Sequence, residues 1–246
     1  MLRTLLLLLV PVIFCCKNAC SQTQSTFSGW NAYFITYKFE KKFSLVFDGQ
    51  LRSSDKWEEL QTAIFRPGLQ YQVRKNHFAT LGYGLIGHHR RIAGIDGWAA
   101  EHRLWEQYII TQTFLLHKRA SSLQHRFRLE QRFIGKSALA GDHLARNGHD
   151  FAHRLRYFAR TIIPMKKTNS FTKGYFASLQ NEVFVNIGDA SATNDKFFDQ
   201  NRAYASIGYK ISSKFDVEIG YMNQFIQGRS SNTSNNILQL AGYCRL

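Results

Sequence analysis

Apolar and polar side chains alternate residue by residue along most of this chain, and this period of two constrains the fold more than any other feature. The clearest run covers residues 123–133, where Leu123, Phe127 and Leu129 share one parity and Arg or Glu side chains occupy much of the other. Such alternation predicts a β-strand with one apolar and one polar face. About eleven such runs follow one another, and each is long enough to cross a bilayer as a tilted strand. No segment has a convincing helical period, so the chain is expected to be all-β.

The connections between the runs alternate in length. Those after odd-numbered runs are short, whereas those after even-numbered runs are mostly longer and polar, namely residues 53–59, 88–100, 135–149, 188–197 and 227–234. This alternation is typical of transmembrane barrels, with the short turns in the periplasm. Eleven is an unusual count for a bacterial barrel, so either residues 23–29 add a short strand or one run is miscounted. We predict a closed antiparallel transmembrane β-barrel of ten to twelve strands, with twelve favoured.

The N-terminus has the features of a secretory signal peptide. Arg3 supplies positive charge, residues 5–16 form an apolar core, and the small residues around Ser21 suit cleavage after that position. We therefore expect a signal peptide at residues 1–21 and a single barrel domain at residues 22–246.

The cysteines allow one alternative to this cleavage. Lipidation would use Cys15, Cys16 or Cys20, although none of them follows the residues that a lipoprotein signal requires. Cleavage after Ser21 leaves Cys244 as the single cysteine, so no internal disulfide is expected in the exported domain.

A soluble β-barrel or sandwich would show the same alternation with its apolar face turned inward. Two features favour the membrane. Aromatic side chains such as Tyr37, Tyr71 and Tyr209 lie near the ends of the runs, as in interfacial girdles. The polar faces combine Arg and Glu with Gly and Ser, which suits a crowded polar interior. The expected location is the outer membrane of a Gram-negative bacterium.

A series of motifs on the polar faces occurs in one order along the chain. It includes Trp30-Asn31-Ala32-Tyr33, Phe65-Arg66-Pro67-Gly68, Glu101-His102-Arg103-Leu104-Trp105, His125 to Phe133, Arg154-Leu155-Arg156-Tyr157, Asn181-Glu182-Val183-Phe184 and Asp199-Gln200-Asn201-Arg202. With these motifs the chain resembles the exported proteins grouped as domain of unknown function 2490, found mainly in Bacteroidota. The resemblance covers nearly the whole chain after residue 21. It implies an outer-membrane β-barrel and supplies no activity or catalytic residues.

Charged residues share the polar parity of their runs and are expected to project into the barrel. We predict a charge ladder in the lumen formed by Arg66, Glu101, Arg103, Arg126, Arg128, Glu130, Arg132, Arg154, Arg156, Glu182 and Arg202. Bidentate Arg–carboxylate pairs would satisfy these charges and brace the wall, which favours a structural or assembly-related role. Because Arg outnumbers Glu on these faces, the alternative is a narrow passage that prefers small anions.

Lipid hydrolysis at the outer wall is a second alternative. His125 lies on the apolar parity, and His102 is followed by Glu106, but no Ser accompanies either in a recognisable motif. His88-His89, His143 and His149 lack Cys or carboxylates at ligand spacing and are interpreted as solvated loop residues. No catalytic residue, metal or cofactor is therefore predicted.

The chain's formal net charge of +15 raises the question of partners. Its basic residues are interleaved at strand spacing and an exported protein does not meet nucleic acid, so nucleic-acid binding is not expected. Loop residues such as Arg90 and Arg91 suit contact with lipopolysaccharide phosphates. The expected partners are outer-membrane lipid, lipopolysaccharide and the barrel assembly machinery.

Overall fold

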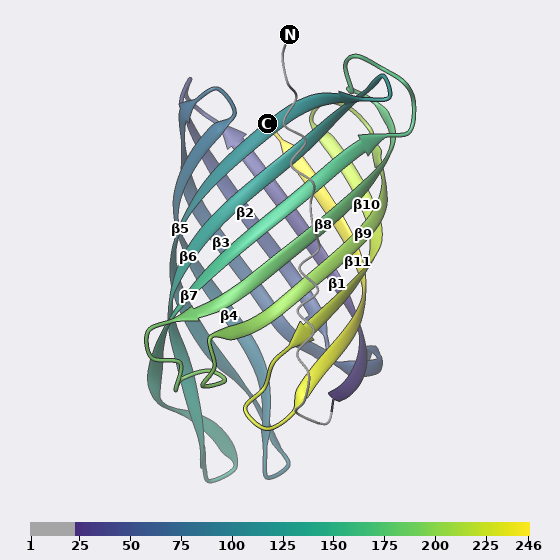
Figure 1. Ribbon diagram of the computed structural model, residues 1–246. Coiled ribbons are helices and arrows are strands. Elements are labelled where there is room, and N and C mark those ends of the chain that lie inside the picture. Colours follow the sequence, from purple (N-terminus) through teal and green to yellow (C-terminus); the bar gives the residue numbers. More distant parts are fainter. Residues whose placement is uncertain (1–22) are drawn as a thin grey trace.

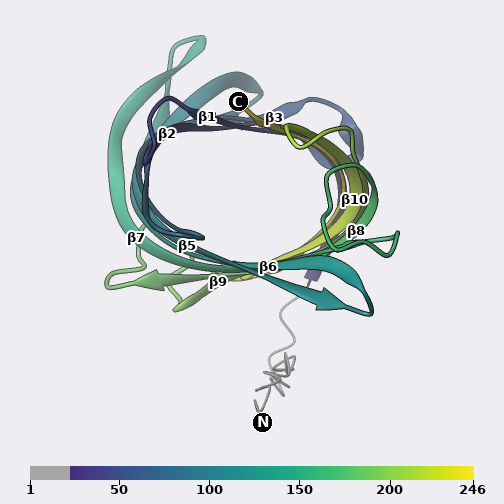
Figure 2. The ribbon, with the colours of Figure 1, turned by 90° about the horizontal axis from the view of Figure 1, so that it is seen from above.

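A computed structural model describes residues 23–246, so the expected signal peptide lies outside the described residues. The chain forms a closed β-barrel of eleven strands, which Figure 1 shows from the side and Figure 2 shows end-on. A short 3-10 helix, Asp55–Trp57, lies between the second and third strands. The strands are β1 Thr23–Lys38, β2 Phe43–Ser53, β3 Leu60–Arg74, β4 His77–Ile92, β5 Ile95–Leu116, β6 Arg119–Ala140, β7 His143–Pro164, β8 Gly174–Ile187, β9 Phe198–Lys210, β10 Phe215–Ile226 and β11 Asn232–Arg245.

The strands are arranged as a meander that closes on itself. Each strand pairs antiparallel with its neighbour in sequence, and β1 pairs with β11 in parallel to seal the ring. The count of eleven lies within the predicted range, but the favoured count of twelve is wrong. Residues 23–29 extend β1 and do not form a strand of their own. In a meander with an odd number of strands, the first and last strands run in the same direction. The prediction of a wholly antiparallel barrel is therefore wrong at the β1–β11 seam.

The two ends of the barrel differ. One end carries the short turns, whereas at the other end β4–β5 and β6–β7 continue as long hairpins beyond the ring (Figure 1). The segments 88–100 and 135–149, expected to be loops, are therefore mostly paired strand with tight turns at their tips. The β4–β5 tip places Ala93 and Gly94 at φ values of 50° and 82°, and glycine adopts such values without steric cost. Polar alternation does not distinguish a solvated hairpin from a loop, which explains the error.

The two faces of the wall divide as the period of two predicts. On β10, Glu218 is 2% exposed and faces inward, while its neighbour Ile219 is 53% exposed and faces outward. The same contrast holds on β6 for buried Arg128 beside exposed Phe127, while Leu129, on the same face as Phe127, is half-buried. The buried side chains are thus largely polar and the exposed outer ones largely apolar, the reverse of a soluble barrel.

Aromatic side chains cluster on the outer wall near the short turns. Phe39 stacks on Phe43, Phe43 packs against Tyr71, and Tyr175 meets Tyr209 edge to face. Such rings are typical of the boundary between apolar and aqueous surroundings. Within residues 23–246, no helix is both long enough and apolar enough to cross a membrane.

Candidate functional site: an ionic network inside the barrel

Register places opposite charges side by side within the barrel. Glu130 on β6 lies opposite Arg154 on β7, and Glu182 on β8 lies opposite Arg202 on β9. Because all these residues share the inward parity, their side chains meet across and along the wall and are shielded from solvent. The network that results joins residues from β2 through β10.

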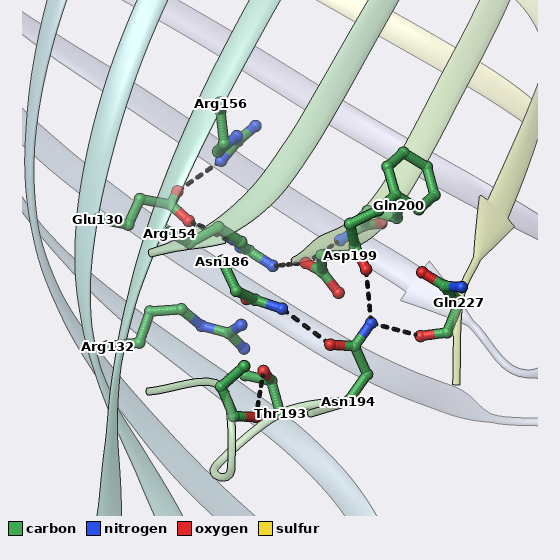
Figure 3. Close-up of polar contacts among 12 residues, drawn as sticks. Glu130, Arg132, Arg154, Arg156, Asn186, Thr193, Asn194, Asp199, Gln200 and Gln227 are labelled. Atoms are coloured by element: carbon green, nitrogen blue, oxygen red, sulfur yellow. Dashed lines mark hydrogen bonds and ion pairs between the residues drawn. The ribbon is translucent and has the colours of Figure 1, made fainter. Parts of the chain in front are cut away.

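Glu130 is the centre of this network. Its side chain is 0% exposed and accepts hydrogen bonds from Arg154 Nε and Nη2 at 3.0 and 2.7 Å and from Arg156 Nη1 at 2.5 Å (Figure 3). Arg103 and Arg128 approach the same carboxylate at 3.7 and 3.9 Å. One buried negative charge therefore holds four guanidinium groups together.

Glu182 on β8 is a second buried acceptor. Its Oε1 accepts from Arg126 Nη2 at 2.7 Å and from Arg156 Nη2 at 2.7 Å, so Arg156 bridges Glu130 and Glu182. Arg202 Nη1 lies 3.9 Å from the other oxygen of Glu182. The two carboxylates thus belong to one connected system.

Glu101 forms a third cluster toward the hairpin end. It pairs with Arg103 at 2.6 and 2.9 Å and with Arg132 at 2.6 and 3.2 Å. His88 Nε2 lies 3.2 Å from the same carboxylate. His88, interpreted from sequence as a solvated loop residue, is therefore an inward-facing strand residue.

All eleven sequence-predicted ladder residues lie on the inner wall, and several partners were missed. Asp48 pairs with Arg66 at 2.5 Å, and Asp199 pairs with Arg154 at 2.9 Å. Glu218 pairs with Arg160 at 2.6 Å. Strand parity marks Asp48, Arg160 and Glu218 as inward-facing. Asp199 has the opposite parity to Gln200 and Arg202, and it is buried where the register between β8 and β9 shifts, so parity alone does not predict it.

Aromatic rings hold the guanidinium groups in place. Arg128 lies over Trp105 at 4.4 Å from the ring centroid, and Arg156 and Arg202 both lie 4.6 Å from that of Phe184. Phe184 is fully buried at the centre of the network. Stacking on aromatic faces stabilises buried cations beyond what their carboxylate partners provide.

The β8–β9 and β10–β11 connections are joined at the hairpin end by Asn194 (Figure 3). Asn194, in the β8–β9 connection, donates to the carbonyl oxygens of Phe198 at 2.7 Å and of Gln227 at 2.8 Å. Its own side-chain oxygen accepts from Asn186 Nδ2 at 2.8 Å. Asn194 is 7% exposed, whereas Phe197 in the same connection is 73% exposed, so this connection is anchored to the barrel through Asn194.

Three arginines inside the barrel donate hydrogen bonds to glutamine side chains and, within residues 23–246, have no hydrogen-bonded carboxylate. Arg52, Arg128 and Arg202 donate to the side-chain amide oxygens of Gln50, Gln107 and Gln200, respectively. Among the described residues, none of these three arginines has a carboxylate within hydrogen-bond distance. The interior therefore carries positive charge that its own acids do not neutralise.

The outer-wall histidines have tyrosine partners. His125 Nδ1 lies 2.8 Å from the Tyr157 hydroxyl, and His102 Nδ1 contacts the Tyr83 hydroxyl at 2.5 Å. Glu106 faces outward and accepts from Gln131 at 3.2 Å. Over residues 23–246 no group of three or more His, Cys, Asp or Glu side chains could hold a metal ion.

His89 and Arg91 of the β4–β5 hairpin belong to a group of charged residues separate from the network. His89 lies 3.3 Å from Glu59, and Arg91 donates to Asp96 at 2.7 Å. The hydrogen bond from Arg91 lowers the pKa of Asp96 below its usual value. Arg91 is therefore already paired with an acid at this tip.

Comparison with known proteins identifies one relationship. No curated protein and no solved structure matches the chain. A family model described as "Protein of unknown function (DUF2490)" matches residues 27–235, which covers the barrel from β1 into β11. The match spans most of the sequence and all of the ionic network, and the chain therefore belongs to the DUF2490 family of proteins of unknown function.

Proposed function

We propose that this protein is an outer-membrane β-barrel of a Gram-negative bacterium, with a filled lumen and a structural or assembly-related role. The inverted distribution of side chains supports the location, because the exposed wall is apolar while the polar groups are buried. The short turns would lie in the periplasm and the long hairpins outside the cell. The resemblance to the family favours Bacteroidota as the source.

The observation that carries the structural role is the burial of the network. Glu130 and Phe184 are both 0% exposed, and charged side chains of β7 form ion pairs there with partners on β8 and β9. A water-filled channel would leave such groups solvated. At the hairpin end, the hydrogen bonds of Asn194 to Phe198 and Gln227 hold two connections together, which supports a second barrier to flow through the lumen.

Conductance tests this proposal. Purified protein inserted into planar bilayers is expected to show no steady current, while a known porin inserted under the same conditions reports that insertion works. Steady, anion-selective conductance of the wild-type protein would overturn the filled lumen and support an anion channel. That second candidate is favoured by the arginines that lack carboxylate partners.

Partners follow from the location. Lipid would contact the apolar wall, and the barrel assembly machinery would insert the chain. Arg90 remains the better candidate for lipopolysaccharide phosphate, because Arg91 is held by Asp96. Fractionation tests the location: the protein is expected in outer membranes with heat-modifiable gel mobility, and recovery as a soluble periplasmic protein would contradict it.

A further inference from the structure

A cavity of about 230 Å³ lies inside the barrel on the short-turn side of the network. Its wall includes Gln70, Gln124 and Tyr243, which stand near the strand ends that lead into the short turns, or near the C-terminus. Its floor is formed by Arg128, Arg156 and Glu182 of the network. The buried network, in which Glu130 is 0% exposed, lies between this cavity and the hairpin end, which makes the cavity a blind pocket that faces the short turns.

The lining of the cavity is rich in guanidinium groups. Six arginines line it, namely Arg66, Arg126, Arg128, Arg156, Arg160 and Arg202, against only two carboxylates, Asp48 and Glu182. Glu130 and Glu218 compensate Arg156 and Arg160 from the adjacent layer. Even with those two acids counted, six cations face four anions, and the excess resides on Arg128 and Arg202.

Several of these arginines have N–H groups without a partner. Arg66 Nε, Arg126 Nε, Arg128 Nη1, Arg160 Nε and Arg202 Nε are buried and have no hydrogen-bond acceptor within the described residues. Arg128 is only 4% exposed and its Nη1 lies 3.9 Å from Glu130, too far for a hydrogen bond. Buried charged donors without acceptors are costly, and an anion that accepts from them relieves that cost.

The charge of the two barrel ends supports entry from the short-turn side. The five connections there, residues 39–42, 75–76, 117–118, 165–173 and 211–214, together contain eight lysines and one glutamate. The connections at the hairpin end instead contain six acidic and three basic residues. A positive collar around the entrance raises the local concentration of anions and speeds their association.

We propose that this cavity is a binding site for a small organic or inorganic anion that carries phosphate or carboxylate groups. Arg128 and Arg202 supply the uncompensated charge, Arg66 and Arg126 add further donors, and the hydroxyl of Tyr243 borders the site. The volume admits a compact dianion and excludes a nucleotide or a lipid. The ligand enters from the short-turn side and leaves the same way, so binding does not require a conducting lumen.

Thermal unfolding of the refolded barrel in detergent, with inorganic phosphate or succinate added, tests the proposal. Sodium chloride at matched ionic strength controls for screening. Saturable stabilisation by at least one of the dianions is expected, with a matching saturable heat in isothermal titration calorimetry. Absence of both effects up to 10 mM of either dianion (roughly the range of weak metabolite binding) would overturn the proposal.

Arginine substitutions inside and outside the cavity test whether the dianion binds in the cavity. Arg128→Gln and Arg202→Gln remove charge without leaving a hydrogen-bonded carboxylate unpaired, and each is expected to weaken dianion binding at least about tenfold. Arg245→Gln removes a short-turn-end arginine that pairs with Asp216 outside the cavity and is expected to bind like the wild type. Equal binding by Arg128→Gln and the wild type, or equal loss in Arg245→Gln, would contradict a site in the cavity. Arg202→Gln provides the same test if Arg128→Gln does not refold.

The experiments distinguish the binding site in the cavity from the proposed filled lumen. Conductance of the wild type would contradict the filled lumen and leave saturable dianion binding intact. A silent barrel without dianion binding would contradict only the cavity site.

Discussion

Glu130→Gln is the most informative substitution in the ionic network, because it keeps the shape of the side chain while it removes the charge and one of the two acceptor oxygens. In the native protein Glu130 accepts three hydrogen bonds from Arg154 and Arg156, at 2.5–3.0 Å. Breaking a buried ion pair by removing one partner typically costs about 3–5 kcal/mol. Arg154 retains Asp199 and Arg156 retains Glu182, which offsets part of the loss. We therefore expect the free energy of unfolding to fall by about 3 kcal/mol, at the lower end of that range.

Equilibrium unfolding by urea, followed by tryptophan fluorescence of the barrel refolded in lipid vesicles, measures this loss. Glu106→Gln is the matched control, since Glu106 is exposed on the outer wall and, among residues 23–246, its carboxylate accepts hydrogen bonds only from the amide of Gln131. No measurable destabilisation is expected for the control. A loss below about 1 kcal/mol for Glu130→Gln would show that water screens these charges, and it would refute the reasoning from burial.

Three further substitutions test other parts of the structure. Ile219→Arg places a charge on the outer wall and is expected to destabilise the barrel in vesicles by about 2–4 kcal/mol; an unchanged urea midpoint would show that this face does not meet lipid. Gly82→Ala would bring a Cβ into overlap with the ring of Trp105 and is expected to cost about 1–3 kcal/mol in the same assay, whereas Gly242→Ala, with its nearest contact at 3.8 Å, should be tolerated. Asn194→Ala removes two donors to backbone carbonyls and should speed hydrogen exchange in residues 188–197; unchanged exchange would contradict its role in holding the two connections together.

Much of the barrel can be predicted from the period of two. Because side chains on a strand alternate between faces, the parity of Arg128 and Ile219 follows from the sequence alone. The strand count was less certain, since alternation in residues 23–29 fits an extended β1 as well as a separate strand. The long hairpins were missed for a similar reason, because segments 88–100 and 135–149 are rich in polar residues and glycine, as loops also are.

The candidate site could be predicted only in part. Inward parity selects the members of the network, including Glu101, Glu130 and Glu182, without assigning their partners. The pair of Arg154 and Asp199 joins residues 45 positions apart, and their meeting depends on the stagger of β7, β8 and β9. The blind cavity likewise depends on where large side chains such as Trp105 and Phe184 come to rest, which no local pattern specifies.

The parallel seam between β1 and β11 has a consequence for the order in which the barrel assembles. Every other pair of neighbouring strands is joined by a connection of at most ten residues, but the seam pairs residues 209 positions apart, as in Thr23 with Asn232. Contacts between nearby segments form faster than contacts between distant ones, because less chain entropy is lost. The ten hairpins can therefore form a curved sheet before the ring is sealed. Until β1 meets β11, that sheet presents two unpaired edges, and a cellular factor that guards such edges would act on these two strands.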